Sequence, residues 1–264
     1  MPVDIQTLEP AVRDPKKLRR TAWILVAIMI LGGIMVLSAY VLKNKADQKK
    51  ALSEDHSRPA IISRIDKGRD LRVLRQDNHQ AGLLDLGGKV WLACAVSSSD
   101  PAISARSVEV MKRLAERYKA TEDVAFVTLV IDPGPAEDLH GLLVTESGKL
   151  GATLPQWWVA STEPQTLYKF IKNEFKTSLF PHQEDGKWKY DTSIVVVDRN
   201  RHVRNAVIPQ KRGGEAYVAR FDFDQAAEWD ARGVKTGTDQ TNAQTLEGVL
   251  VKTIEQLREE PLKD

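Results

Sequence analysis

The stretch LDLGGKVWLACAV, residues 84–96, decides the fold of this chain. Its second half, Val90–Val96, is a continuous apolar run with the length of one strand. Such a run, without polar alternation, predicts a strand that is buried on both faces. The pair Gly87-Gly88 interrupts the pattern just before the run and indicates a turn there. The stretch therefore predicts the central strand of a sheet that is flanked by helices.

The segments that follow predict a strand–helix–strand unit. A polar loop, residues 97–100, leads into a segment whose apolar side chains recur at helical spacing, and residues 124–131 form a second continuous apolar run. The turn Asp132-Pro133-Gly134 closes this second strand in the ordinary way. The apolar face of the helix comprises Val108, Met111, Leu114, Ala115 and Tyr118.

The remaining elements extend this unit into an α/β domain with a mixed central sheet. Thr241 and Gln244 have the spacing of a capping box that opens a last helix. Residues 209–240, rich in glycine and charge, indicate an insertion or flexible excursion with at most one short helix. Further helices are expected at residues 136–149 and 166–175, and further strands at 157–160, 193–197 and 203–208.

A long apolar segment precedes this domain. From Thr21 to Leu42 the chain carries no charged side chain, and it is long enough at helical rise to span the hydrocarbon core of a bilayer. Trp23 and Tyr40 lie near the two ends, where amphipathic aromatic side chains prefer the membrane interface. A cleaved signal peptide would have a shorter apolar core followed by a small-x-small site, which only residues 36–38 approach. We expect an uncleaved transmembrane helix whose partner is membrane lipid.

This helix divides the chain into four parts. They are a cytoplasmic tail (1–20), the transmembrane helix (21–42), a polar linker with a helical turn or two (43–60) and a soluble domain (61–264). Five basic residues precede the helix and four follow it closely, so the positive-inside rule gives only a slight preference for a cytoplasmic N-terminus.

The charge distribution excludes one class of partner. The formal net charge is +2, of which residues 1–43 carry +3, so the rest of the chain is near neutral at −1. A near-neutral domain offers no electrostatic reason to bind nucleic acid. The basic residues beside the apolar segment match anionic lipid head groups instead.

Four features of the domain occur in an order shared with a known family. Residues 84–91 (LDLGGKVW) precede and begin the first core strand, a helix follows the next loop, and residues 124–133 (VAFVTLVIDP) form a strand and turn. Residues 192–199 (TSIVVVDR) form a later strand. Over residues 65–208 and the last helix, the chain resembles the SCO/SenC/PrrC family of membrane-anchored copper chaperones for cytochrome oxidase. The resemblance implies a thioredoxin-like fold, a periplasmic domain tethered to the inner membrane, and a place beside the respiratory chain.

The same resemblance implies that the copper site has degenerated. The family binds copper with two cysteines four residues apart and a distant histidine, and these positions correspond to Asp100, Ser104 and Tyr190, the last beside Asp191. Cu(I) prefers soft thiolate ligands, so this oxygen set suits it poorly. We expect Asp100 to cap the following helix, with Pro101 at its first position and Ser104 on its surface. No cofactor is predicted, and copper follows only from the resemblance.

Other side chains offer weak alternatives for such chemistry. The only cysteine, Cys94, lies within the predicted central strand and is expected to pack in the core. Without a second cysteine it cannot resolve a mixed disulfide. His182, in a polar loop, and Asp191 are the weak substitute candidates for metal ligands. The sequence shows no phosphate-binding loop, zinc spacing or catalytic triad, so we expect no enzymatic activity.

The pair Trp157-Trp158 is the candidate surface for a protein partner. Adjacent side chains in an extended segment point to opposite faces. One indole is then expected in the core, while the other is exposed or meets an insertion or a partner.

These inferences lead to a functional hypothesis with three alternatives. The hypothesis is a non-catalytic, membrane-anchored accessory or assembly factor for respiratory cytochrome oxidase that acts by protein binding. The alternatives are a copper metallochaperone that uses His182 and Asp191, a fixed structural subunit of a respiratory membrane complex, and a thiol-redox protein that depends on Cys94.

Overall fold

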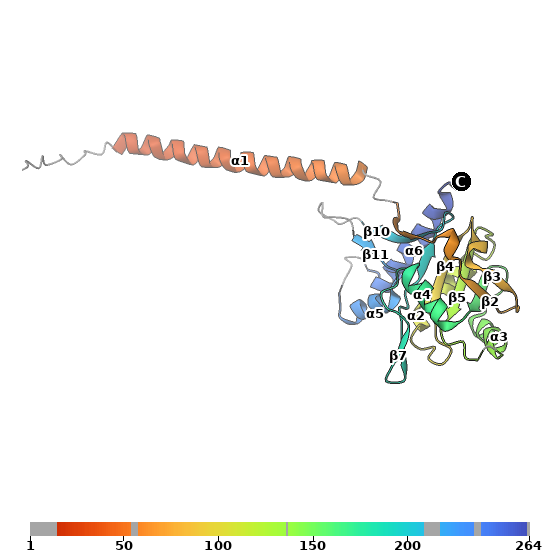
Figure 1. Cartoon of the computed structure of the whole chain (residues 1–264). Coiled ribbons are helices and arrows are strands. Elements are labelled where there is room, and N and C mark those ends of the chain that lie inside the picture. The colour runs from red at the N-terminus through yellow and green to blue at the C-terminus, as the bar shows by residue number, and fades with distance from the viewer. Residues whose placement is uncertain (1–14, 54–57, 136, 209–216, 235–238, 263–264) are drawn as a thin grey trace, which may run out of the picture. The chain divides into compact units, whose positions relative to one another are not determined.

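The computed structural model describes residues 15–53, 58–135, 137–208, 217–234 and 239–262. The chain forms two compact units (Figure 1). One contains the N-terminal helix α1, Pro15–Ser53, and the other contains the remaining helices and strands.

Helix α1 contains the predicted membrane segment. Its window Arg19–Tyr40 has a mean hydropathy of 2.5 and is long and apolar enough to cross a membrane. The apolar side chains of this window are exposed, as at Trp23, where 73% of the surface is accessible. The helix continues through residues 43–53 of the predicted linker, further than the turn or two expected. Lysine and alanine predominate there, and these good helix formers let the helix propagate.

The second unit is built on one mixed sheet with strand order β1-β10-β9-β4-β5-β6-β2-β3, and β11 pairs with β10. Strands β4 and β5 are parallel, while β9 is antiparallel to β4 and β10 is antiparallel to β9. The central order β10-β9-β4-β5 is that of a thioredoxin-like fold, so the predicted fold class is confirmed. The strands are β1 Ala60–Arg64, β2 Arg72–Arg75, β3 Gln80–Gly82, β4 Val90–Val96, β5 Val124–Val130, β6 Trp157–Ser161, β9 Val195–Val197, β10 His202–Ile208 and β11 Tyr217–Ala219, and β7 His182–Glu184 and β8 Lys187–Lys189 form a separate hairpin.

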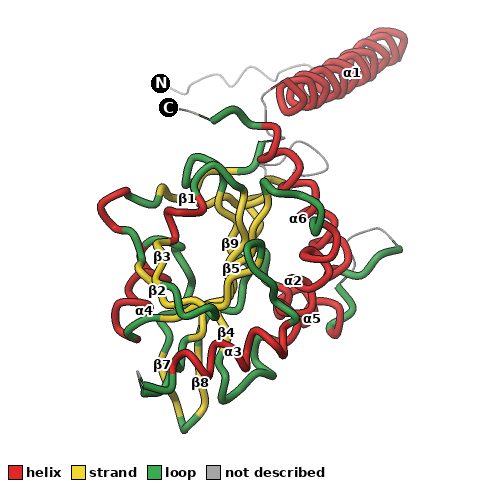
Figure 2. Tube along the Cα trace, turned by 90° about the vertical axis from the view of Figure 1, so that its right-hand side faces the viewer, coloured by secondary structure: helices red, strands yellow, loops and turns green. Residues whose placement is uncertain are grey.

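Helices cover both faces of this sheet (Figure 2). Helices α2, α3, α5 and α6 contribute to the hydrophobic cluster on one face, and α4 contributes to the cluster on the other. The helices are α2 Ala105–Arg117, α3 Leu139–Leu150, α4 Pro164–Asn173, α5 Phe223–Ala231 and α6 Asn242–Glu259, with short 3₁₀ turns at Lys67–Arg69 and Leu83–Leu86.

Strand β4 is the central strand that its sequence predicts. All seven of its residues are buried. Leu92 and Cys94 face the cluster beneath α2 and α6, while Trp91 and Ala93 face the cluster beneath α4. Because successive side chains of a strand point to opposite faces, this one run supplies the middle of both hydrophobic layers.

The boundaries of the last third differ from the prediction in one important respect. Thr241 and Gln244 form the predicted capping box at the start of α6. A flexible excursion over residues 209–240 is wrong for the part that the structure describes, which holds one short helix, α5, as predicted. Strand β11 pairs with β10, and Phe221 and Phe223 are only 1% and 2% exposed. The stretch therefore belongs to the core, and residues 209–216 and 235–238 lie outside the described residues.

The buried position of Phe223 generates a stability prediction. We expect Phe223→Ala to lower the free energy of unfolding by about 3–5 kcal/mol, because it leaves a cavity between α5 and the sheet. Val234→Ala, at a half-exposed position in the same region, is the control and should change it by no more than about 0.5 kcal/mol. Urea unfolding of the detergent-solubilised chain, followed by tryptophan fluorescence, measures both. Equal, small effects would show that this stretch is a peripheral excursion.

Candidate functional site

The candidate site is the loop of residues 97–104, which leaves the carboxyl end of β4. Asp132 follows the neighbouring parallel strand β5, so its carboxylate lies at the same edge of the sheet. It accepts hydrogen bonds from the Ser98 N–H (2.7 Å), the Ser97 hydroxyl (2.7 Å), and the N–H and hydroxyl of Ser99 (2.9 and 2.6 Å). One carboxylate thus fixes three consecutive residues of the loop.

The ionised form of Asp132 is favoured by these contacts. Burial opposes ionisation, but the hydrogen bonds from Ser99, Ser98 and Ser97 outweigh it and hold the pKa of Asp132 below its ordinary value. The sequence marked this residue only as part of a strand-closing turn. Its role was missed because its partners lie 33 to 35 residues earlier in the chain.

The expected helix cap at Asp100 is wrong. Helix α2 begins at Ala105 with Ser104 at its N-cap position, and residues 101–104 form turns. The Asp100 N–H donates to the Ser97 hydroxyl (3.1 Å), and its carbonyl accepts from the Ile103 N–H (3.3 Å). These bonds close a turn and delay the start of the helix. Ser104 is 1% exposed, so its expected place on the helix surface is also wrong.

Tyr190 lies against the start of the same loop. The Ser97 N–H donates a hydrogen bond to its phenol oxygen at 3.2 Å. The side chain is 7% exposed and packs in the cluster on the α4 side of the sheet. Burial raises the pKa of Tyr190 to about 12, so the phenol is neutral at physiological pH. The structure therefore brings Tyr190 to the loop that carries Asp100 and Ser104, and it uses the phenol to hold that loop.

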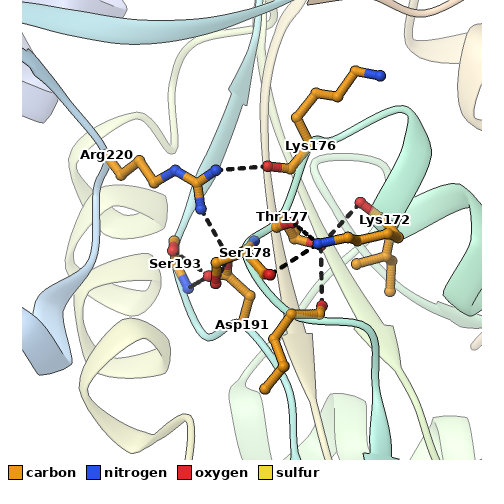
Figure 3. Close-up of polar contacts among 9 residues, drawn as sticks. Lys172, Lys176, Thr177, Ser178, Asp191, Ser193 and Arg220 are labelled. Carbon is orange, nitrogen blue, oxygen red and sulfur yellow. Dashed lines mark hydrogen bonds and ion pairs between the residues drawn. The ribbon is translucent and has the colours of Figure 1, made fainter.

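Asp191, one of the weak metal-ligand candidates, is the centre of a second network (Figure 3). Its carboxylate accepts from the N–H and hydroxyl of Ser178, the N–H and hydroxyl of Ser193, and the Arg220 guanidinium (3.2 Å). Burial opposes ionisation, but the hydrogen bonds from Ser193 and Ser178 hold the pKa of Asp191 below its ordinary value. The network ties the segment after α4 to the start of β9 and to the residue after β11.

His182, the other weak candidate, lies elsewhere. It is exposed on β7, opposite Lys189, and its Nδ1 is 2.8 Å from the Phe180 carbonyl oxygen. Among the residues that the structure describes, no three His, Cys, Asp or Glu side chains are grouped so that they could hold one metal ion.

Neither Trp157 nor Trp158 is exposed, at 4% and 5%, so both indoles pack in the core and the alternative of an exposed, partner-facing indole is wrong. The two rings do point to opposite faces of the sheet, as predicted. Trp157 donates its indole N–H to the Thr128 hydroxyl (3.0 Å). The Trp158 indole donates to the Pro155 carbonyl (3.1 Å), and the Arg75 guanidinium lies 4.6 Å from its ring centroid. Both faces of β6 are covered, so these side chains offer no docking surface.

Cys94 is the core residue that the sequence predicts. It is 2% exposed, and its sulfur lies 3.8 Å from the Thr128 hydroxyl. Burial raises the pKa of the Cys94 thiol to about 12. A thiol in this state supplies almost no thiolate at neutral pH.

Fold and site together define a thioredoxin-like α/β domain that is joined to an apolar helix. In this domain the loop after β4 is held by hydrogen bonds to the Asp132 carboxylate and the Tyr190 phenol. No protein-family model and no curated protein matches the chain.

Solved structures do resemble it. A SCO1/SenC family lipoprotein from Bacillus anthracis is 20% identical, with a TM-score of 0.45 over 72% of this chain and 94% of its own. BsSco, a member of the Sco family of cytochrome c oxidase assembly proteins, is 15% identical, with a TM-score of 0.47 over 74% and 95%. Copper-bound ScoI from Bradyrhizobium japonicum is 13% identical, with a TM-score of 0.44 over 69% and 97%. The structural neighbours are SCO/SenC family proteins.

The residues at the three implied ligand positions do not fit copper. Asp100, Ser104 and Tyr190 offer a carboxylate, a hydroxyl and a neutral phenol, which are hard oxygen donors, whereas Cu(I) selects thiolates and thioethers. Ser104 and Tyr190 are buried, and the Tyr190 oxygen already accepts a hydrogen bond from the loop.

The Asp132 contacts generate a prediction for stability against pH. The pKa of Asp132 is lower in the folded state than in the unfolded state. Its ionised carboxylate therefore contributes fully to the free energy of unfolding above the unfolded-state pKa of about 3.9, and this contribution is lost as the pH falls through the folded-state pKa. Asp132→Asn should therefore lower the free energy of unfolding by about 1–3 kcal/mol at pH 7 and by less at pH 3. Urea unfolding at pH 7, 5 and 3 measures this.

The control is Asp185→Asn, at an exposed position in the turn between β7 and β8. This substitution should leave the unfolding midpoint nearly unchanged at each pH. A destabilisation by Asp132→Asn that is the same at pH 7 and pH 3 would contradict the proposed role of the ionised carboxylate.

Proposed function

We propose that this chain is a membrane-anchored, non-catalytic thioredoxin-like protein that serves as an accessory or assembly factor for respiratory cytochrome oxidase by binding other proteins. The observation that carries the proposal is the loop after β4. Asp132 and Tyr190 accept hydrogen bonds from serine hydroxyl and backbone N–H groups of this loop. The loop is therefore held as a fixed surface. A fixed surface suits recognition, which gains from preorganisation.

The chemistry available to the chain supports binding rather than catalysis. Thiol–disulfide exchange starts with a thiolate and needs a second cysteine to resolve the mixed disulfide. Cys94 is the only cysteine, and burial raises the pKa of its thiol to about 12. The oxygen ligands at the implied copper positions are unsuited to Cu(I), and the Asp191 carboxylate is occupied by five donors.

The proposed location follows from α1. Its apolar window is compatible with a single-pass anchor, and the flanking basic residues slightly favour a cytoplasmic N-terminus. The domain that follows would then be periplasmic, at the inner membrane. The association with cytochrome oxidase rests on the SCO/SenC-like motifs at residues 84–91, 124–133 and 192–199.

Capture of partners from membranes tests this proposal. The full chain with a C-terminal tag, purified from gently solubilised membranes of its own organism, should retain cytochrome oxidase subunits in less than stoichiometric amounts, and more after chemical cross-linking. Cys94→Ser is the matched control and should capture the same subunits, because the thiol is not used.

A stable stoichiometric complex would instead identify a fixed structural subunit. Loss of capture in Cys94→Ser would favour the thiol-redox alternative. Absence of oxidase subunits, with and without cross-linking, would overturn the respiratory assignment.

A further inference from the structure

A pocket of about 90 Å³ lies between the end of β10, β11, α5 and α6. It is lined by part of the stretch that the sequence marked as an insertion. Tyr217 of β11 and Trp229 of α5 contribute aromatic rings, and Leu246 and Val249 of α6 contribute aliphatic surface. Tyr217 is 47% exposed, so the pocket is reached from the surface.

The polar side of the pocket carries a carboxylate, that of Asp222, with unused hydrogen-bonding capacity. Asp222 caps α5, where one of its oxygens accepts the Gln225 N–H at 2.9 Å. Within the described part of the chain, this is the hydrogen bond that its carboxylate makes. Burial raises the pKa of Asp222, and the neighbouring carboxylates Asp191 and Asp224 raise it further. Asp191 and Asp224 are paired with Arg220 and Arg106, whereas Asp222 forms no ion pair among the described residues, so its carboxylate is the charge that a cation in the pocket would meet.

Arg220 also lines the pocket, but its guanidinium group contacts residues other than Asp222. Figure 3 shows its guanidinium turned toward Asp191 and Lys176. It forms an ion pair with the Asp191 carboxylate (3.2 Å) and donates to the Lys176 carbonyl (2.7 Å). Because Asp191 offsets this charge, Arg220 does not neutralise Asp222.

The size of the pocket decides the kind of ligand. Sites for cofactors and drug-sized molecules have volumes of about 300–1,000 Å³, several times larger than this pocket. A space of about 90 Å³ matches a single side chain. Aliphatic walls suit the stem of a long side chain, while a carboxylate and aromatic rings suit a cationic head.

We propose that this pocket receives one lysine or arginine side chain of a protein partner, with its stem along Leu246 and Val249 and its cationic head at Asp222. This inference rests on the proposed function, because it names the chemistry by which a protein partner is recognised.

Titration with side-chain probes tests the pocket. The probe is Nα-acetyl-lysine N-methylamide, and its uncharged counterpart is Nα-acetyl-norleucine N-methylamide. The full chain, in detergent with ¹³C-labelled Ile, Leu and Val methyl groups, reports binding through the signals of Ile208, Leu246 and Val249. We expect saturable shifts with the lysine probe and an affinity for the norleucine probe that is lower by about fivefold or more.

Two variants locate the charge effect. Asp222→Asn keeps a good helix cap and should weaken the lysine probe by about fivefold or more. Glu228→Gln, at an exposed position on the same helix, should leave its affinity unchanged. Equal affinities for the two probes, an unchanged affinity in Asp222→Asn, or no shifts at these methyl groups would each overturn the proposal.

The two proposals fail separately. If the probe does not bind but oxidase subunits are captured, the pocket assignment is wrong and the proposed function stands. If the probe binds as expected and no oxidase subunit is captured, the pocket stands and the respiratory assignment is wrong.

Discussion

The Asp132 carboxylate holds the loop on which the proposed function depends. Strands β4 and β5 are parallel, so a carboxylate that follows β5 meets the loop that leaves β4. Four hydrogen bonds from residues 97–99 to Asp132 fix that loop as a defined surface. Tyr190, which lies between β8 and β9, accepts a fifth hydrogen bond from the loop. Loops at this edge of an α/β sheet commonly carry function because the strands position them. Here the polar groups of the loop are used to hold it in place.

A second network, centred on Asp191, connects this loop region to the last third of the domain. Arg220 joins Asp191, and it follows β11 and precedes the buried Phe221. The stretch from β11 to α5 is thereby part of the core and also lines the pocket at Asp222. The fixed loop and this pocket are separate features of one compact unit, and preorganised surfaces of this kind favour the recognition of partners.

Much of the fold follows from sequence, whereas the interactions at the site do not. Strands β4 and β5 are recognisable because continuous apolar runs depend only on neighbouring residues, and the capping box at Thr241 is equally local. The burial of Cys94 follows from its place in such a run. The role of Asp132 could not be predicted, because its partners become neighbours only when the sheet forms. Phe221 and Phe223 do carry a local signal, because apolar and charged residues alternate over residues 219–224 as in a half-buried strand, but the glycines and charges around this stretch favoured an excursion.

The central claim is that the proposed binding loop, held by Asp132 and Tyr190, carries oxygen groups at Asp100, Ser104 and Tyr190 that do not bind Cu(I). Titration of the purified full chain with Cu(I), in competition with a chelator of known affinity, tests it most directly. The account predicts no binding tighter than about 1 µM, since the hard oxygen donors at these positions cannot replace thiolates. Stoichiometric Cu(I) binding well below that concentration would contradict it and would favour a metallochaperone with unrecognised ligands.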